Sequence, residues 1–417
     1  MSEWKKVKLG ECCLKIGSGS TPKGGSTVYV ESGTSLIRSQ NVYNLSFDYN
    51  GLTHITEDAA NKLKGVTVFS NDILLNITGD SVARTCIVPN DVLPARVNQH
   101  VAIVRTDCKL INPRFLNYYL ASPRMQAHML SLAVGKGASR NAMTKQMIEN
   151  FEVPCPPLPT QHRIATILSR YDSLIENYQK QIKLLEEAAQ RLYKEWFVDL
   201  HFPGHENTKI VDGVPEGWGK KKLIEFGCSL ESGARPKGGV DSNLKNGIPS
   251  VGAENVIGLG KYNYSSEKLI TNQFYSQMRK GKIKDRDILI YKDGAYIGRT
   301  SLFQDGFPHK EMAVNEHVFL LHALNENYQY YIFFTLYQKQ YFEKMQKLNK
   351  NAAQPGLNQK ALLDLGMLCP SENFVLAFRK VIEPIMKALF SKANQIRLLT
   401  EARNRLLPKL MSGEIKV

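Results

Sequence analysis

Cysteine and histidine are the residues of this chain with the most versatile chemistry, since both bind metals and both serve as catalysts. The seven cysteines are odd in number and form no Cys-x-x-Cys pair. This spacing disfavours a zinc site and a disulfide framework, and it favours a reducing compartment. His201 and His205 lie in a segment rich in proline and glycine, where we expect no metal site. His100 and His317 lie in apolar stretches, and we interpret them as structural residues of a strand.

Several short motifs match catalytic or nucleotide-binding sites in part. Asn112-Pro113-Arg114-Phe115 has three residues of the Asn-Pro-Pro-(Phe/Tyr) motif with which amino-methyltransferases hold a flipped base, but it also has the form of a helix start. Gly17-x-Gly19 breaks off at Pro22, and Gly19 to Gly25 lacks the Lys-Ser/Thr of a Walker loop. Glu414-x-Lys416 is half of a nuclease signature. We therefore expect no catalytic residue, no metal and no cofactor bound by this chain.

The charge balance is the first positive indication of function. Lysine and arginine total 54 against 39 aspartates and glutamates, giving a formal net charge of +15 and a pI near 9.3. Such a basic balance commonly indicates a polyanionic partner. On charge alone, a basic protein without such a partner is an open alternative.

The composition is that of a globular protein, with 43% hydrophobic and 22% charged residues. No apolar run approaches the length of about 18 residues that a membrane-spanning helix needs. Residues Met1 to Gly10 carry Glu3, Trp4 and several lysines where a signal peptide would be apolar. We expect a cytoplasmic protein.

The sequence repeats itself at a shift of about 214 residues. The string Ser-Gly-x-x-Pro-Lys-Gly-Gly occurs at Ser18 to Gly25 and again at Ser232 to Gly239. The shift becomes 215 near Asp72 and 217 near Val97, and it returns to 214 at Cys155. The chain therefore consists of two similar halves.

Each half begins with a mixed pattern of strands and helices. Short β-rich runs, such as Val97 to Val104, alternate with Gly and Asn turns. Asn112-Pro113 predicts the start of one helix through Phe115 to Leu132, and Thr144 and Asn358 predict the N-caps of a further short helix. We expect the α/β (α+β) class, with two mixed domains in tandem.

A long helix follows in each half. From Ile164 to Trp196, apolar residues alternate in steps of four and three, which is a heptad seam. The seam recurs 214 residues later, interrupted by Lys392 and Arg403, and Pro384 should kink or restart that helix. The strict period predicts two long antiparallel coiled-coil helices that pack on each other. The alternative is that each helix is buried separately against its own domain.

These patterns predict five segments: a first mixed domain over 1–157, a central long helix over 158–200, a linker over 201–217, a second mixed domain over 218–371 and a C-terminal long helix over 372–417. Ile164 to Trp196 would rise about 48 Å as a helix, more than the ~34 Å of one DNA turn. The arrangement suggests a caliper that reads two half-sites of a duplex.

The sequence resembles the specificity subunit of type I restriction–modification systems over essentially its whole length. The residues that carry the resemblance are Trp4 with Lys8-Leu9-Gly10, Ser18-Gly19-x-x-Pro22, Asp72-Ile73-Leu74, Phe202-Pro203-Gly204 leading to Gly217-Trp218, and the string from Leu406 to Ile415. The resemblance implies two target recognition domains that read the two parts of a bipartite double-stranded DNA target, and a subunit without catalytic activity. It also implies two modification (methyltransferase) subunits that use S-adenosylmethionine, and restriction (translocase/endonuclease) subunits that use ATP and Mg²⁺.

The repeat itself suggests which residues contact DNA. Equivalent residues that are identical in both halves are expected to contact phosphate, since phosphate contacts do not specify sequence: Lys23 with Lys237, Arg84 with Arg299, and Lys136 with Lys350. Equivalent loop residues that differ are candidates for reading bases. They are Thr21 and Arg235, Asn76 and Tyr291, Thr78 and Asp293, and Arg140 and Gln354. In addition, Arg38-Ser39-Gln40 aligns with Gly252-Ala253-Glu254.

Two other functions stay open at this point. One is an enzyme with degenerate motifs, which predicts binding of S-adenosylmethionine or a metal by the isolated chain. The other is a coiled-coil scaffold for proteins or RNA, which predicts no preference among DNA duplexes.

Overall fold

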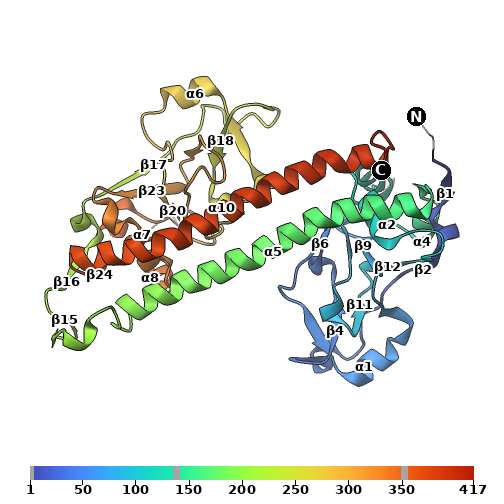
Figure 1. Ribbon diagram of the computed structural model, residues 1–417, viewed down its shortest axis with the longest axis horizontal. Helices are drawn as coiled ribbons and strands as arrows, with labels where there is room; N and C mark the ends of the chain where they lie inside the picture. Colours follow the sequence, from blue (N-terminus) through green and yellow to red (C-terminus); the bar gives the residue numbers. More distant parts are fainter. Residues whose placement is uncertain (1–3, 135–140, 349–355) are drawn as a thin grey trace. The chain divides into compact units, whose positions relative to one another are not determined.

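The computed structural model describes residues 4–134, 141–348 and 356–417. The chain forms two compact units: unit 1 comprises residues 1–174 and 399–417, and unit 2 comprises residues 175–398. Two helices of 40 residues each, α5 (Leu158–Phe197) and α10 (Glu372–Met411), contribute to both units (Figure 1). The five predicted segment boundaries do not coincide with this division and stay a prediction.

Unit 1 contains two main sheets. The first has the order β10-β9-β12-β2 and is antiparallel throughout, and the second has the order β3-β7-β4-β11-β8, with β4 and β11 parallel. Two small sheets pair β1 with β13 and β5 with β6. The strands are β1 (Lys6–Lys8), β2 (Cys13–Ser18), β3 (Tyr29–Val30), β4 (Thr34–Ile37), β5 (Val42–Tyr43), β6 (Ser46–Phe47), β7 (Thr53–Ile55), β8 (Thr67–Val68), β9 (Ile73–Asn76), β10 (Thr85–Ile87), β11 (Ala95–Val97), β12 (Val101–Thr106) and β13 (Glu152–Pro154).

Unit 2 repeats this topology. Its antiparallel sheet has the order β17-β23-β20-β21, and its mixed sheet has the order β19-β18-β22, with β18 and β22 parallel. β16 pairs with β24 as β1 pairs with β13, and β14 with β15 forms a hairpin. The strands are β14 (Ile210–Val211), β15 (Val214–Pro215), β16 (Gly219–Lys222), β17 (Cys228–Ser232), β18 (Ile248–Val251), β19 (Lys268–Ile270), β20 (Ile288–Tyr291), β21 (Thr300–Leu302), β22 (Ala313–Val314), β23 (Val318–Ala323) and β24 (Gly366–Cys369). The prediction of two mixed domains is confirmed.

Three of the shorter helices begin at caps that the sequence predicts. The side chains of Asn112, Thr144 and Asn358 each accept a hydrogen bond from the first turn of their helix. These three are α2 (Pro113–Leu120), α4 (Lys145–Glu149) and α9 (Gln359–Leu363), and the other short helices are α1 (Glu57–Lys62) and α3 (Pro123–Ala133) in unit 1 and α6 (Asn272–Gln277), α7 (Gln329–Tyr337) and α8 (Lys339–Leu348) in unit 2.

The prediction of one helix through Phe115 to Leu132 is wrong, because the chain forms α2 and α3 with a break between them. Ser122 has an extended backbone with ψ of 145°. The proline at position 123 disfavours the helical conformation in the residue before it, and it starts a new helix instead.

The β-rich run from Val97 to Val104 is also not one strand. It divides into β11 and β12 around a turn at Asn98 to His100. The corresponding turn in unit 2 comprises Asn315 to His317 and joins β22 to β23. Both histidines therefore lie in turns and not within strands, contrary to the interpretation from the sequence.

The two long helices pack on each other in opposite directions. In unit 1, Ile164 and Leu168 of α5 share a core with Leu407 and Leu410 of α10. In unit 2, the rings of Trp196 of α5 and Phe378 of α10 lie 5.9 Å apart. The helix-on-helix prediction is therefore confirmed, and each helix also contributes residues to the hydrophobic cores of both units (Figure 1). α10 does not restart at Pro384 but continues through it.

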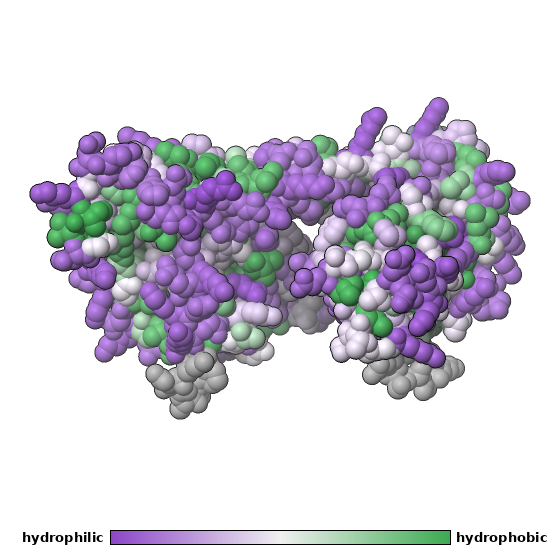
Figure 2. Space-filling model, turned by 90° about the horizontal axis from the view of Figure 1, so that it is seen from below, coloured by the Kyte–Doolittle hydropathy of each residue, from purple (hydrophilic) through white to green (hydrophobic). Residues whose placement is uncertain are grey.

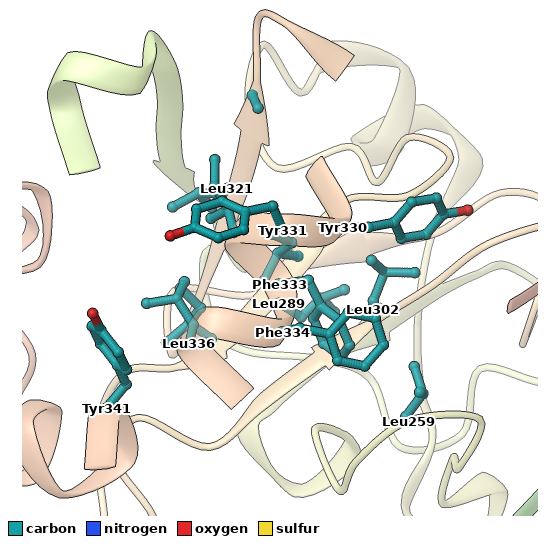
Figure 3. Packing of buried hydrophobic residues seen from close by; sticks show 14 of the residues in the cluster. Leu259, Leu289, Leu302, Leu321, Tyr330, Tyr331, Phe333, Phe334, Leu336 and Tyr341 are labelled. Atoms are coloured by element: carbon teal, nitrogen blue, oxygen red, sulfur yellow. The ribbon is translucent and has the colours of Figure 1, made fainter. Parts of the chain in front are cut away.

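The core of unit 2 is built around α7, whose residues Gln329 to Leu336 are all buried. A helix that is apolar on every side needs a partner on every side. In Figure 3, Phe333 and Phe334 of this helix lie close to Leu289 and Leu302 of the neighbouring strands. The visible face of each unit is mostly hydrophilic, with apolar residues in small separate patches (Figure 2). In the described part of the chain, no helix is long and apolar enough to cross a membrane.

Candidate nucleic-acid interface

The turn that carries the histidine joins β11 to β12 in unit 1 and β22 to β23 in unit 2, and the same hydrogen bonds hold it in both units. In unit 1, the amide of Asn98 donates to Ile37 O at 3.0 Å, and its side chain accepts from the amide of His100 at 3.1 Å. In unit 2, the amide of Asn315 donates to Val251 O at 3.0 Å, and its side chain accepts from the amide of His317 at 2.9 Å. Each histidine is therefore held at a defined place beside the mixed sheet.

A glycine brings a second loop against each turn. The amide of Gly19 donates to Val101 O at 2.9 Å, and a Cβ at position 19 would overlap the carbonyl oxygen of Val97. In unit 2, a Cβ at position 233 would likewise overlap the carbonyl oxygen of Val314. Only glycine permits this close approach of two backbones. The glycines place the residues that follow, Thr21 in unit 1 and Arg235 in unit 2, beside the histidine turns.

The result in unit 1 is a group of neutral side chains around His100. Thr78 Oγ1 lies 2.6 Å from His100 Nδ1, and Gln99 Nε2 lies 3.2 Å from His100 Nε2. Thr21 Oγ1 donates to Gln99 Oε1. If the Gln99 amide donates to Nε2, the proton of the neutral ring is on Nδ1 and points to Thr78. We refer to Thr21, Thr78, Gln99 and His100 as the histidine cluster of unit 1.

The equivalent positions in unit 2 carry charges. Arg235 Nη2 lies 2.7 Å from His317 Nε2 and also pairs with Glu316, and Asp293 Oδ2 lies 3.2 Å from His317 Nδ1. Partial burial opposes ionisation of Glu316, but the hydrogen bond and charge of Arg235 lower the pKa of Glu316 below its usual value. We refer to Arg235, Asp293, Glu316 and His317 as the histidine cluster of unit 2.

A cavity of about 590 Å³ opens beside the unit 2 cluster. Arg235 and His317 line one part of it, and Glu254 and Lys268 form an ion pair of 2.9 Å on its wall. Burial raises the pKa of Glu254, but Lys268 outweighs this effect and leaves that pKa below its usual value. The cavity thus presents both hydrogen-bond donors and acceptors, as the edges of bases require.

The comparisons with known proteins give the family. Residues 1–187 match the model of the type I restriction modification DNA specificity domain. The type I restriction enzyme MjaIX specificity subunit of Methanocaldococcus jannaschii is 26% identical over an alignment of 423 positions, which covers 99% of this chain and 93% of that protein. The HindI specificity subunit of Haemophilus influenzae is 20% identical and covers both chains completely.

The resemblance to the specificity subunits of type I restriction–modification systems is confirmed by the family model and by relatives that match over the whole length of the chain. Its fold is similar to that of the S subunit of a type I system from M. genitalium, with a TM-score of 0.60, 16% sequence identity and coverage of 98% of this chain and 96% of that chain. The specificity subunit is the non-catalytic, DNA-recognising subunit of the restriction enzyme.

The remaining candidates of unit 1 lie around the segment after β4. Arg38 Nη2 donates to Gly51 O at 2.6 Å, and the exposed Gln40 donates to the same oxygen at 3.2 Å. Asn76 is fully buried, and its side chain donates to Ser39 O at 2.8 Å. In this specificity subunit Asn76 therefore supports the loop that carries Arg38 to Gln40. A role of Asn76 in reading bases stays a prediction.

Among the described candidates for phosphate contacts, two lysines are exposed and two arginines are half-buried. Lys23 and Lys237 are exposed in equivalent loops. The guanidinium carbon of Arg84 lies 4.5 Å from the ring centre of Tyr43, and that of Arg299 lies 3.9 Å from the ring centre of Tyr296. Tyr291, half-buried, lies edge to face with Tyr296 at 6.5 Å. Four further candidates lie outside the described residues of the specificity subunit: Lys136, Arg140, Lys350 and Gln354.

Four cluster residues were not among the DNA-contact candidates from the sequence: Gln99 and Glu316, which were not singled out, and His100 and His317, which were interpreted as structural residues. The signal was present, because Asn98-Gln99-His100 aligns with Asn315-Glu316-His317 and only the middle residue differs. The apolar pattern on both sides suggested a continuous strand and concealed the turn. Among the described residues, no group of three or more His, Cys, Asp or Glu side chains is placed to bind a metal.

Proposed function

We propose that this specificity subunit reads a bipartite double-stranded DNA target, with each unit reading one word of it. The paired helices α5 and α10 hold the readers at a fixed separation, so that the two words are divided by a gap of unspecified sequence. The subunit itself performs no chemistry in this scheme, which agrees with its family.

The observation that supports the proposal best is the duplicated histidine cluster. The same backbone frame carries Thr21, Thr78 and Gln99 in unit 1, but Arg235, Asp293 and Glu316 in unit 2. A duplicated structural site has no reason to change a neutral group into a charged one. Two sites that read different words have such a reason, because each base pair needs its own set of hydrogen-bond donors and acceptors.

The side chains favour different chemistry in the two words. Gln99 offers an amide, the group that pairs with adenine through two hydrogen bonds. Arg235 is the type of residue that pairs with guanine, and Glu254 and Asp293 can accept from cytosine. Lys23, Lys237, Arg84 and Arg299 would contact phosphates and set the position of each unit on the duplex.

The modification and restriction subunits carry the reactions in this proposal. Two modification (methyltransferase) subunits would dock on the specificity subunit and methylate adenine with S-adenosylmethionine, and restriction subunits would use ATP and Mg²⁺. The exposed apolar residues Leu184 and Leu398 of the two helices are available for such docking.

Selection from random duplex DNA tests the proposal. The chain is combined with its modification subunit, and bound duplexes are enriched and sequenced at low salt. We expect two short words separated by a gap of constant length. One continuous word would contradict the bipartite target, and no enrichment would contradict DNA reading and support a scaffold instead.

A further inference from the structure

The seam between α5 and α10 contains an ion pair in unit 1. Arg403 of α10 donates to Asp172 Oδ1 of α5 at 2.6 Å, and the hydroxyl of Tyr118 from α2 donates to Asp172 Oδ2. The side chains of Arg403 and Asp172 are only 14% and 27% exposed. Arg403 interrupts the apolar seam at this point, but both oxygens of its partner are hydrogen-bonded.

The repeat provides an internal comparison for this pair. A shift of 214 residues relates Asp172 to Met386 and Arg403 to Ala189. Met386 and Ala189 are both fully buried in the core of unit 2. The same place in the seam is thus charged in unit 1 and apolar in unit 2.

The second interruption of the seam, Lys392, shows the same asymmetry. Its Nζ lies 5.2 Å from the ring centre of Tyr178, which favours a cation–π interaction. Tyr178 and Lys392 are themselves equivalent positions of the repeat. Elsewhere, equivalent seam positions are apolar in both helices, for example Leu168 with Ile382 and Leu192 with Leu406. Those apolar positions cannot distinguish one long helix from the other.

We infer that Asp172, Arg403 and Lys392 select the partner helix. They favour the pairing of α5 with α10 within the chain over the pairing of α5 with α5, or of α10 with α10, between two copies. If two α5 helices paired, each Asp172 would face Ala189 without a cation. If two α10 helices paired, each Arg403 would face Met386, and Lys392 would face Lys392. A charged group that loses its partner on burial disfavours the wrong pairing, as polar seam residues do in coiled coils generally.

The inference concerns assembly and does not depend on DNA recognition. A chain of two similar halves has an evident alternative state, a dimer in which α5 pairs with α5 and α10 pairs with α10 of a second copy. The ion pair and the Tyr178–Lys392 contact form only when α5 pairs with α10, and both are lost when two copies of the same helix pair. They therefore favour the monomeric specificity subunit.

The test is the oligomeric state of a full-length chain whose seam has been made symmetric. The triple variant Asp172→Met, Arg403→Ala, Lys392→Tyr gives both helices the same residue at each of these places. Light scattering after gel filtration, over a hundredfold range of concentration, is expected to show a monomer for the unmodified chain. The triple variant is expected to dimerise at least tenfold more tightly.

A matched control and a second variant complete the experiment. Lys183→Ala with Glu187→Ala removes an exposed ion pair within α5 and should leave the chain monomeric. If circular dichroism shows that the triple variant is unfolded, the milder Asp172→Asn, Arg403→Gln, Lys392→Tyr variant is expected to dimerise in its place. A folded symmetric variant that stays monomeric over the whole range would overturn the inference, and so would equal dimerisation of the unmodified chain.

Discussion

Within the histidine clusters, the histidine and its backbone frame are shared and the surrounding side chains differ. Nδ1 is contacted by Thr78 in unit 1 and by Asp293 in unit 2. In unit 2, the guanidinium of Arg235 is oriented by Glu316 and His317 together. A guanidinium held in this way loses less conformational freedom when it meets a base than a free arginine does. The cluster is therefore the best place to change one word of the target alone.

We predict that Arg235→Thr, Asp293→Thr and Glu316→Gln, made together, alter the unit 2 word only. These changes give unit 2 the cluster of unit 1. The preference for the original unit 2 bases should fall by about 1–3 kcal/mol per base pair, roughly fivefold to 150-fold. The measurement is the affinity of the complex for duplexes altered in one word at a time.

The control for this variant is an exposed ion pair of α8, removed by Lys339→Ala with Glu343→Ala. It should change neither word. Equal loss of preference in both words would show that the cluster stabilises the protein or binds phosphate and does not read bases.

The sequence allowed most of these residues to be found, because equivalent positions that differ could be compared within one chain. Thr21 and Arg235 were identified in this way, and so were Thr78 and Asp293. Gln99 and Glu316 were missed because a turn of three residues between two apolar strands does not interrupt the apolar pattern. Burial of Asn76 could not be predicted either, because it depends on Ser39, which is far from it in sequence.

At the level of helices and strands, local signals were reliable where a single residue type determines the geometry. Side-chain caps defined the starts of α2, α4 and α9, and the heptad period defined α5 and α10. The break at Pro123 was overlooked because the apolar pattern continues across it. Asn112 is the residue at which a structural and a catalytic interpretation compete. Its side chain caps α2 through the amide of Phe115 at 3.1 Å, and its own amide donates to Gln161 of α5 at 2.8 Å.

We predict that Asn112→Ala lowers stability and leaves methylation by the assembled complex intact. Loss of the cap should reduce the free energy of unfolding by about 1 kcal/mol, which urea denaturation can measure. Asn358→Ala, which removes the corresponding cap of α9, is the matched control and should cost a similar amount. Loss of methylation without loss of stability would instead support the flipped-base motif.

At the scale of the whole molecule, the proposed function has the two units read the two DNA words and the helices set the distance between those words. These roles are separable, since the seam is defined by a seven-residue period and the reading clusters lie outside the helices. The net charge of +15 would attract any duplex and carries no information about sequence. Changes in helix length should therefore alter the spacing of the words and leave the words themselves unchanged.

The corresponding prediction is that three heptads inserted after Lys180 in α5 and three after Asn394 in α10 lengthen the gap. These two points are equivalent under the 214-residue shift, and whole heptads preserve the seam. The added rise is about 32 Å, nearly one turn of DNA, so both units can again meet the same side of the duplex. Selection from random duplexes should return the original two words with a gap longer by about nine base pairs. Seven residues inserted between Asp212 and Gly213, at the exposed tip of the β14–β15 hairpin, should leave the gap unchanged. An unaltered gap in the heptad variant, or new words, would refute the division between reading units and spacer helices.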